Sequence, residues 1–229
     1  MTHGLAGHRA SMPAQVDTVV LDVDGTLLDS NYHFVIAWSR AFDALGVSVP
    51  LWRIHRSIGM GGDKLVAALA GDEVEQQSGD GLRDRWEQEY DKLIDETRLL
   101  PGAKELLRVL KERGIDVALA SSGIPKHAKH AFELLDAEEL ADTATTSEDV
   151  EDSKPDPDLV EEALSRLDSD RACVIGDSVY DIEAAQRSGV PAYGLLTGGY
   201  GRSELEAAGA AGVYEDIPDL LDHVDDWLG

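Results

Sequence analysis

Short apolar runs alternate with amphipathic stretches along most of the chain. Residues 16–22 form the first run, whose β-branched composition predicts a strand buried on both faces. Similar runs predict further strands at 115–120, 143–146, 173–176, 192–196 and 212–214. Apolar residues at helical spacing predict helices at 103–113, 126–135, 157–167, 182–188 and from about 218 onward. This alternation predicts an α/β fold, a doubly wound parallel sheet of the Rossmann-like type with helices on both faces.

A long block after the first strand departs from this alternation. Its apolar positions recur only at helical spacing, over 32–45, 54–58, 63–69 and 82–94, and nothing in it resembles a strand. We therefore expect an α-helical cap that is inserted directly after the first strand. The expected division is a disordered tail at 1–14, a core built from 15–30 and 99–229, and a cap at 31–98. The tryptophans of the block fit packing inside the cap better than stacking on a ligand, and they are Trp38, Trp52 and Trp86.

The composition allows a large folded domain and narrows the range of partners. The 229 residues are 43% hydrophobic, which is enough for a sizeable core. The formal net charge of -25 repels nucleic acids and anionic membranes, so we expect neither as a partner. An anionic substrate would be repelled too, and a site for one must therefore supply its own local cations.

The single cysteine, Cys173, excludes an intramolecular disulfide and favours a reducing compartment. It lies in an apolar run, which is typical of a small core residue rather than a reactive thiol. No window approaches the roughly 18 apolar residues of a membrane-spanning helix. Residues 1–15 lack the continuous apolar segment of a secretory signal. We therefore expect a cytoplasmic protein.

The first predicted strand ends in two carboxylates separated by one residue, Asp22 and Asp24, and Gly25 follows them. Side chains alternate along a strand, so both carboxylates should point to the same side, and Gly25 lets the backbone turn away. The carboxyl end of a parallel strand is where such a sheet opens to ligands. Two carboxylates that meet there suit a hard cation, most simply Mg2+, or a pairing of nucleophile and general acid. The alternative is an ordinary strand end with an Asp-Gly turn, but uncompensated buried carboxylates are costly.

Two later segments carry groups that an anion needs. Ser121 follows the strand at 115–120, and its hydroxyl and the N–H groups of Ser122 and Gly123 form an anion site at the start of a helix. A serine in this place is also typical of a helix cap. Lys154 lies next to two prolines that fix the backbone, which indicates a positioned cation. The alternative is an ordinary lysine in a surface loop.

The strand at 173–176 ends in a second acidic pair, Asp177 and Asp181. Two acidic strand ends in one parallel sheet, balanced by a lysine and a hydroxyl, describe a site for Mg2+ and a phosphate group. We therefore expect a small phosphorylated metabolite as the substrate. The oligomeric state leaves no signal in the sequence.

The order of these motifs resembles the haloacid dehalogenase-like superfamily. The residues that carry the resemblance are Asp22-Val23-Asp24-Gly25-Thr26, Ser121, Lys154-Pro155 and Gly176-Asp177 with Asp181. The pattern covers nearly the whole chain beyond the tail, and its first and last motifs are the specific ones. The place of the helical insertion is similar to the subclass with a small α-helical cap, which includes phosphoglycolate phosphatase-like and β-phosphoglucomutase-like enzymes.

The resemblance implies a role for each carboxylate. Asp22 would attack phosphorus and become an aspartyl phosphate, and Asp24 would protonate the leaving oxygen and then activate water. The side chain of Asp22, the backbone carbonyl of Asp24 and the carboxylate of Asp177 would bind Mg2+. Asp181 would be a further metal ligand or a hydrogen-bond acceptor behind the ligands. Asp22 would stay ionised because the metal and a lysine favour its charged form.

The same resemblance implies that Ser121 and Ser122 bind phosphate oxygens and that Lys154 offsets the charge of the nucleophile and the phosphoryl group. Dehalogenases of the superfamily attack carbon and lack an acid two residues after the nucleophile, so Asp24 favours phosphate transfer. We therefore expect Mg2+-dependent hydrolysis of a small phosphate monoester.

Two other functions stay open. A sugar phosphate mutase would keep an arginine in the cap turn to hold a second phosphate, and the turn contains none, although Arg53, Arg56 or Lys64 could replace it from nearby. A catalytically idle binding module on the same fold is the other. The cap turn is a candidate for substrate specificity together with Lys64, with an ordinary connection between helices as the alternative, and it comprises Gly59, Met60, Gly61 and Gly62.

Overall fold

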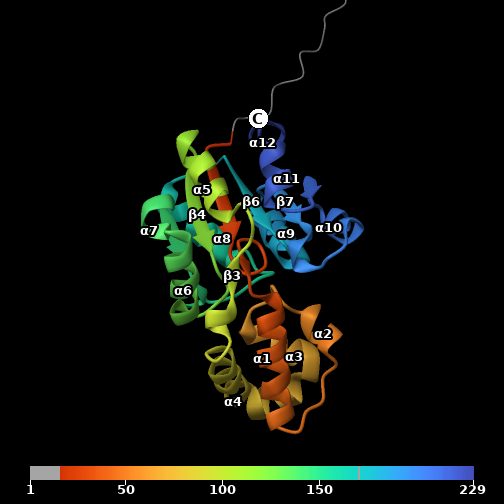
Figure 1. Cartoon of the computed structure of the whole chain (residues 1–229). Coiled ribbons are helices and arrows are strands. Elements are labelled where there is room, and N and C mark those ends of the chain that lie inside the picture. The colour runs from red at the N-terminus through yellow and green to blue at the C-terminus, as the bar shows by residue number, and fades with distance from the viewer. Residues whose placement is uncertain (1–15, 170) are drawn as a thin grey trace, which may run out of the picture.

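Six short strands form one parallel sheet, which confirms the predicted doubly wound α/β fold (Figure 1). The computed structural model describes residues 16–169 and 171–229, so the predicted tail at 1–14 lies outside the described residues. Across the sheet the strands are β5 (Thr143–Thr145), β4 (Asp116–Ala120), β1 (Thr18–Asp22), β6 (Ala172–Gly176), β7 (Ala192–Leu195) and β8 (Gly212–Tyr214). Their β-branched and small apolar residues suit a sheet that is covered on both faces.

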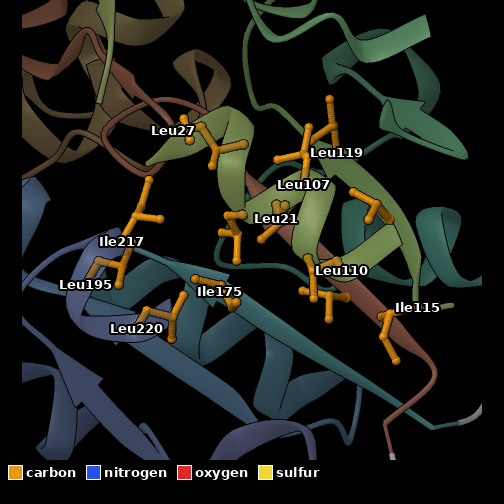
Figure 2. Close-up of a cluster of buried hydrophobic side chains, with 14 of the residues drawn as sticks. Leu21, Leu27, Leu107, Leu110, Ile115, Leu119, Ile175, Leu195, Ile217 and Leu220 are labelled. Atoms are coloured by element: carbon orange, nitrogen blue, oxygen red, sulfur yellow. The ribbon is translucent and has the colours of Figure 1, made fainter. Parts of the chain in front are cut away.

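Helices cover both faces of this sheet, and the side chains of β1 alternate between them. Val19 and Leu21 belong to one hydrophobic cluster, and Val20 belongs to the cluster on the other face. Figure 2 shows the first cluster, in which Leu107 and Leu110 lie near Leu21. The helices of the first face are α5 (Ala103–Glu112), α6 (Pro125–Leu135), α7 (Ala137–Leu140), α11 (Ile217–Asp222) and α12 (Val224–Leu228). Those of the second face are α8 (Asp158–Leu167), α9 (Val179–Arg187) and α10 (Arg202–Ala208).

The direction of chain progress reverses at β1. Strands β4 and β5 lie on one side of β1, and β6, β7 and β8 lie on the other. Open parallel sheets bind ligands outside the carboxyl ends of the strands at such a reversal. Asp22, the last residue of β1, therefore lies where this fold is expected to bind a ligand.

Four helices form a separate layer beyond the carboxyl ends of the strands, at the bottom of Figure 1. They are α1 (Asn31–Ala44), α2 (Leu51–His55), α3 (Gly62–Ala70) and α4 (Asp72–Tyr90), and we refer to them as the helical unit. The unit encloses a hydrophobic cluster of its own, which includes Trp38, Phe42 and Leu65. Trp52 was expected to pack there, but its side chain lies on the surface and is 69% exposed.

A two-stranded antiparallel ribbon joins the helical unit to the sheet. It consists of β2 (Leu28–Asp29) and β3 (Arg98–Leu99), at the two points where the chain leaves and re-enters the sheet-bearing part. The prediction that the block up to residue 98 contains no strand was wrong at Arg98, where β3 begins. Two-residue strands are too short to show an alternation of apolar and polar positions.

Helix α4 begins at Asp72 and ends at Tyr90, so the predicted span of 82–94 was wrong at both ends. Its first half has no apolar stripe, which is why the sequence pattern missed it. Acidic residues in its first turn suit the positive end of the helix dipole. Arg83 also pairs with Glu75 and Asp80, both at 2.8 Å, and holds that half together.

Several short elements left no clear pattern in the sequence. They are α7, α10 and three 3-10 turns, η1 (Ile94–Glu96), η2 (Ser147–Asp149) and η3 (Leu196–Gly198), whereas the helix predicted from about 218 onward is divided into α11 and α12. Among the described residues, every helix is too short or too polar to cross a membrane.

Candidate active site

The acidic ends of β1 and β6 meet at the carboxyl edge of the sheet. The Thr26 hydroxyl lies between them, 2.9 Å from Asp22 Oδ2 and 3.1 Å from Asp177 Oδ1. All three side chains are buried, and Thr26 has no exposed surface. The register of β1 beside β6 therefore brings together two carboxylates that are far apart in the sequence.

Lys154 lies between two of the buried carboxylates. Its ammonium is 2.5 Å from Asp22 Oδ1 and 2.7 Å from Asp181 Oδ1, and the residue is only 2% exposed. The other oxygen of Asp181 accepts hydrogen bonds from the backbone and the hydroxyl of Ser178, at 3.0 and 2.6 Å. Asp181 is thus fixed at the start of α9 and holds Lys154 toward Asp22.

Asp24 turns away from this ion pair and is held by two serines. Ser30 donates a hydrogen bond of 2.6 Å to Asp24 Oδ1, and Ser121 donates one of 3.3 Å to Oδ2. The Ser121 hydroxyl also accepts a hydrogen bond from the backbone N–H of Gly123 at 3.0 Å. The turn after β4 therefore links the second carboxylate of the first motif to the start of α6.

Burial dominates the charge states of these groups. It raises the pKa of Asp22 to about 7, although the neighbouring Lys154 opposes the shift. Burial and the charges of Asp22 and Asp181 raise the pKa of Asp177 as well. Lys154 alone therefore does not keep Asp22 fully ionised near neutral pH, and the expected ionised form requires further positive charge at the site.

Burial acts on the pKa values of Asp24 and Lys154 in opposite directions. Burial raises the pKa of Asp24 above its usual range, and the hydrogen bonds from Ser30 and Ser121 oppose the shift. A carboxyl with a raised pKa can donate a proton near neutral pH. Burial alone would lower the pKa of Lys154, but the charges of Asp181 and Asp22 raise it overall, so its ammonium keeps its proton.

The buried carboxylates fit a hard divalent cation. Asp22, Asp177 and Asp181 each offer a carboxylate oxygen, and these oxygens lie within 4.8 Å of one another. Oxygen ligands of this kind suit Mg2+. Nearby, Asn31 Oδ1 is buried without a hydrogen-bond partner among the described residues. A group of acidic oxygens with excess negative charge and an unsatisfied carbonyl is what such an ion would stabilise.

A second cluster of possible ligands lies between α4 and α6 and already contains a cation. Glu87 and Asp91 accept hydrogen bonds from the Lys126 ammonium at 3.0 and 2.6 Å. His127 is 2.9 Å from the other oxygen of Asp91. The two basic residues at the start of α6, Lys126 and His127, therefore bind the end of α4 and the residue after it.

A cavity of about 480 Å³ opens beside Asp22 and Asp24, between the strand ends and the helical unit. Ser122 and Gly123 line it from the sheet side, next to the predicted anion site. Of the predicted specificity residues, Gly59, Met60 and Gly62 line it. Gly61 and Lys64 are not lining residues.

Those two residues instead join the helical unit to the loop that carries Lys154. Gly61 is buried against the side chain of Ser153. The Lys64 ammonium donates a hydrogen bond of 2.8 Å to the Ser153 carbonyl and pairs with Asp156.

Comparison with known proteins places the chain in a family. A model of haloacid dehalogenase-like hydrolases matches residues 16–189. The chain belongs to this hydrolase family. All four motifs lie within the matched residues, so the family and the site geometry point to the same part of the molecule.

Individual relatives of this hydrolase extend over most of its length. It is 28% identical to a phosphoglycolate phosphatase of Rhodobacter capsulatus, over 91% of this chain and 97% of that protein. It is 32% identical to a phosphoglycolate phosphatase of Nitrosospira multiformis, over 77% and 82%. The crystal structure of a hydrolase from Pseudomonas syringae is 38% identical, covers 92% of this chain and 98% of its own, and superimposes with a TM-score of 0.86.

Some residues of the hydrolase site went unrecognised in the sequence. Thr26 stands inside the first motif, two residues after Asp24, and that position was a signal in the sequence that could have drawn attention to it. Asn31 gave no signal, because a polar residue at the start of a helix is ordinary. Arg83 and Asp84 of α4 lie within the predicted helix at 82–94, but the sequence pattern did not show that they line the cavity.

Proposed function

We propose that this hydrolase is a Mg2+-dependent phosphatase that cleaves a small phosphate monoester. The observation that carries the proposal is the buried pair of Asp22 and Lys154, with Asp24 two residues further on, beside a cavity. A carboxylate can attack a phosphate dianion only where positive charge offsets their repulsion. The phosphoglycolate phosphatases among the relatives support the same reaction class.

Asp22 and Asp24 divide the chemistry between them. A carboxylate oxygen of Asp22 forms a bond to phosphorus as the ester P–O bond breaks, and Asp24 gives its proton to the leaving oxygen. The product alcohol leaves, and Asp22 carries the phosphoryl group. Asp24, now ionised, takes a proton from a water molecule whose oxygen bonds to phosphorus, which releases inorganic phosphate and restores Asp22.

The neighbouring groups bind and orient. Ser121, Ser122 and the N–H of Gly123 would hold phosphate oxygens at the start of α6. Lys154 offsets the charge of Asp22 and the phosphoryl group, and Asp181 keeps its ammonium in place. Mg2+ would be held by the side chains of Asp22 and Asp177 and the backbone carbonyl of Asp24, and it would offset negative charge during transfer.

The helical unit is proposed to act as the cap of this site, with residues 31–98 as the cap domain and 15–30 and 99–229 as the core. Contacts from Lys64, Lys126 and Asp91 cross between the unit and the rest of the chain, and the cavity lies between them. A closed cap would exclude water from the phosphoryl group. The chain has one cysteine, Cys173, and so no intramolecular disulfide, which supports a reducing compartment such as the cytoplasm.

The mutase alternative finds no support in the positions of the cap arginines. Arg56 pairs with Glu204 at 2.5 Å and stacks over the ring of Tyr200. It is therefore engaged with α10 and the residues before it, in the sheet-bearing part, and neither Arg56 nor Arg53 lines the cavity. A second phosphate would find no free cation from these residues.

Hydrolysis of p-nitrophenyl phosphate tests the proposal. We expect turnover with Mg2+, none after EDTA treatment, and recovery when Mg2+ is added back. Asp22→Asn should abolish turnover in a protein that still unfolds cooperatively, and the exposed neighbour Asp29→Asn should behave as wild type. Turnover by Asp22→Asn, or full activity in EDTA, would contradict the mechanism.

A further inference from the structure

The wall of the cavity that faces away from Asp22 is aromatic. Trp38 and Trp86 stack with ring centroids 5.3 Å apart, and Phe34 meets Trp86 edge-on at 5.5 Å. All three line the cavity, as do three further apolar residues, Ile58, Met60 and Leu65. These rings pack on one another inside the helical unit, as expected, and also present a surface to a ligand.

The charged groups on the lining are nearly all acidic. From the helical unit and the loop before Lys154 they are Asp63, Asp80, Asp84, Glu87 and Glu151. Lys126 pairs with Glu87, but Asp84 and Glu151 make no ion pair with any residue that the structure describes. Two exposed carboxylates at the edge of the cavity, those of Asp84 and Glu151, therefore carry negative charge that no described side chain offsets.

Arg83 is the one basic residue on the lining among those that the structure describes, and its guanidinium is already occupied. It donates to both carboxylate oxygens of Glu75 at 2.8 and 3.1 Å, to Asp80 at 2.8 Å, and to the carbonyl of Gly62 at 3.2 Å. Binding a ligand anion would require breaking this network. The arginine therefore shapes the cavity and leaves no free cation for a second anionic group of a substrate.

Two lining residues keep an unused polar atom. The Nε1 of Trp86 and the hydroxyl of Ser122 are buried without a hydrogen-bond partner among the described residues. A bound molecule with oxygen atoms would satisfy them. A volume of about 480 Å³ lies within the range of about 300–1,000 Å³ that is typical of pockets for ring-sized ligands.

We propose that the cavity selects phosphate monoesters whose alcohol part is ring-sized and hydroxylated or cationic, and rejects those that carry a second anion. This inference rests on the proposed phosphatase function and names its substrate class. A ring or an ammonium group gains contact with the aromatic wall, and an ammonium also gains from Asp84 and Glu151. A carboxylate or second phosphate would face those two carboxylates with no cation to offset the repulsion. Phosphoglycolate, which carries a carboxylate, is thus expected to be a poor substrate here.

Matched pairs of substrates test the selection by charge. Phosphoethanolamine and phosphoglycolate are similar in size and differ in the sign of the distal charge, and glucose 1-phosphate and glucuronic acid 1-phosphate form a pair that shares the pyranose ring and differs in one carboxylate. In each pair we expect kcat/KM to be at least about tenfold higher for the member without the carboxylate. Equal values, or a preference for the carboxylates, would overturn the inference.

A charge reversal on α4 tests the structural cause. Asp84→Lys should raise kcat/KM for phosphoglycolate and lower kcat/KM for phosphoethanolamine. Asp95 is exposed and lies outside the cavity, so Asp95→Lys should leave both kcat/KM values unchanged. If Asp84→Lys left kcat/KM for phosphoethanolamine relative to kcat/KM for phosphoglycolate unchanged, the role of this wall would be overturned. p-Nitrophenyl phosphate serves as the common reference, because its failure with every variant would reject the phosphatase function itself.

Discussion

Asn31, the first residue of α1, donates a hydrogen bond of 2.8 Å from its side-chain amide to Asp177 Oδ2. The helical unit thereby touches a proposed metal ligand directly. Hydrogen bonds behind the ligands orient them, and losing one typically lowers metal affinity about 10–100-fold. We therefore expect Asn31→Ala to raise the Mg2+ concentration for half-maximal activity by at least about tenfold.

Titration of activity with Mg2+ checks this prediction, with kcat at saturating Mg2+ as the second readout. We expect kcat to fall much less than the affinity for Mg2+, because Asn31 does not touch the reacting atoms. Ile36→Ala, at an exposed position on the same helix, is the matched control and should leave the titration unchanged. An Asn31→Ala protein with wild-type Mg2+ dependence would show that the hydrogen bond has no positioning role.

The central strands β1, β4 and β6 could be predicted because they are buried almost throughout. Their apolar runs are long enough to be visible, and each ends where polar residues begin. Since the carboxyl ends of parallel strands share one edge, residues such as Asp22 and Asp177 could be expected to lie together. That step needed only the strand direction and the fold class.

The contacts of the helical unit could not be predicted in the same way. The hydrogen bond from Asn31 to Asp177 depends on how α1 is oriented relative to the sheet, and no local sequence pattern determines that orientation. The first half of α4 is stabilised by ion pairs of Arg83 rather than by an apolar face, so hydrophobic periodicity missed it. The cavity wall could not be predicted either, because which residues of α4 line the cavity depends on how that helix packs against the rest of the chain.

Lys154 compensates two buried carboxylates, Asp22 and Asp181, and its removal should be costly. Removing one partner of a buried ion pair typically destabilises a protein by about 3–5 kcal/mol. We expect Lys154→Met to lose that order of stability and at least about 100-fold in kcat for p-nitrophenyl phosphate. Urea unfolding and steady-state kinetics measure the two effects.

Lys129→Met is the control for this change. Lys129 is 75% exposed in its side chain and lies 3.7 Å from Glu133, and such surface pairs contribute little. The control should stay within about 0.5 kcal/mol of wild type and keep full activity. A Lys154→Met protein with the same stability and activity as the control would refute the position of this lysine between the carboxylates.

Glu89 joins three cations on the helical unit and should make stability depend on pH. Its carboxylate is 2.7 Å from Lys92, 2.8 Å from Arg85 and 3.6 Å from Arg40 of α1, and the residue is 5% exposed. The hydrogen bond from Lys92 lowers the pKa of Glu89 below its usual value of 4.5, and burial opposes the shift. A carboxyl whose pKa is lower in the folded state stabilises the protein above the unfolded pKa. That contribution is lost as the pH falls through the folded pKa.

The comparison of wild type with Glu89→Gln isolates this contribution. We expect wild type to be more stable by about 1 kcal/mol at pH 7, and the difference to shrink as the pH falls below about 4.5. Urea unfolding at a series of pH values gives the two curves, and Glu138→Gln, at an exposed position, should follow wild type throughout. A difference that stays constant or grows toward low pH would contradict the ion-pair assignment.

Gly61 and Gly81 lie in neighbouring parts of the helical unit, and alanine should have opposite effects at the two positions. A Cβ at Gly61 would lie 1.9 Å from the Ser153 hydroxyl, so Gly61→Ala must push α3 away from the loop that carries Lys154. Such overpacking typically costs about 1–3 kcal/mol, and the displaced loop should also lower kcat for p-nitrophenyl phosphate.

A Cβ at Gly81 meets nothing within 4 Å, in the interior of α4. Gly81→Ala should therefore stabilise the protein by about 0.5–1 kcal/mol with unchanged activity, because alanine loses less conformational freedom in a helix. Urea unfolding and kinetics of both variants decide the matter, since a harmless Gly61→Ala would show that α3 and the Lys154 loop are not in close contact.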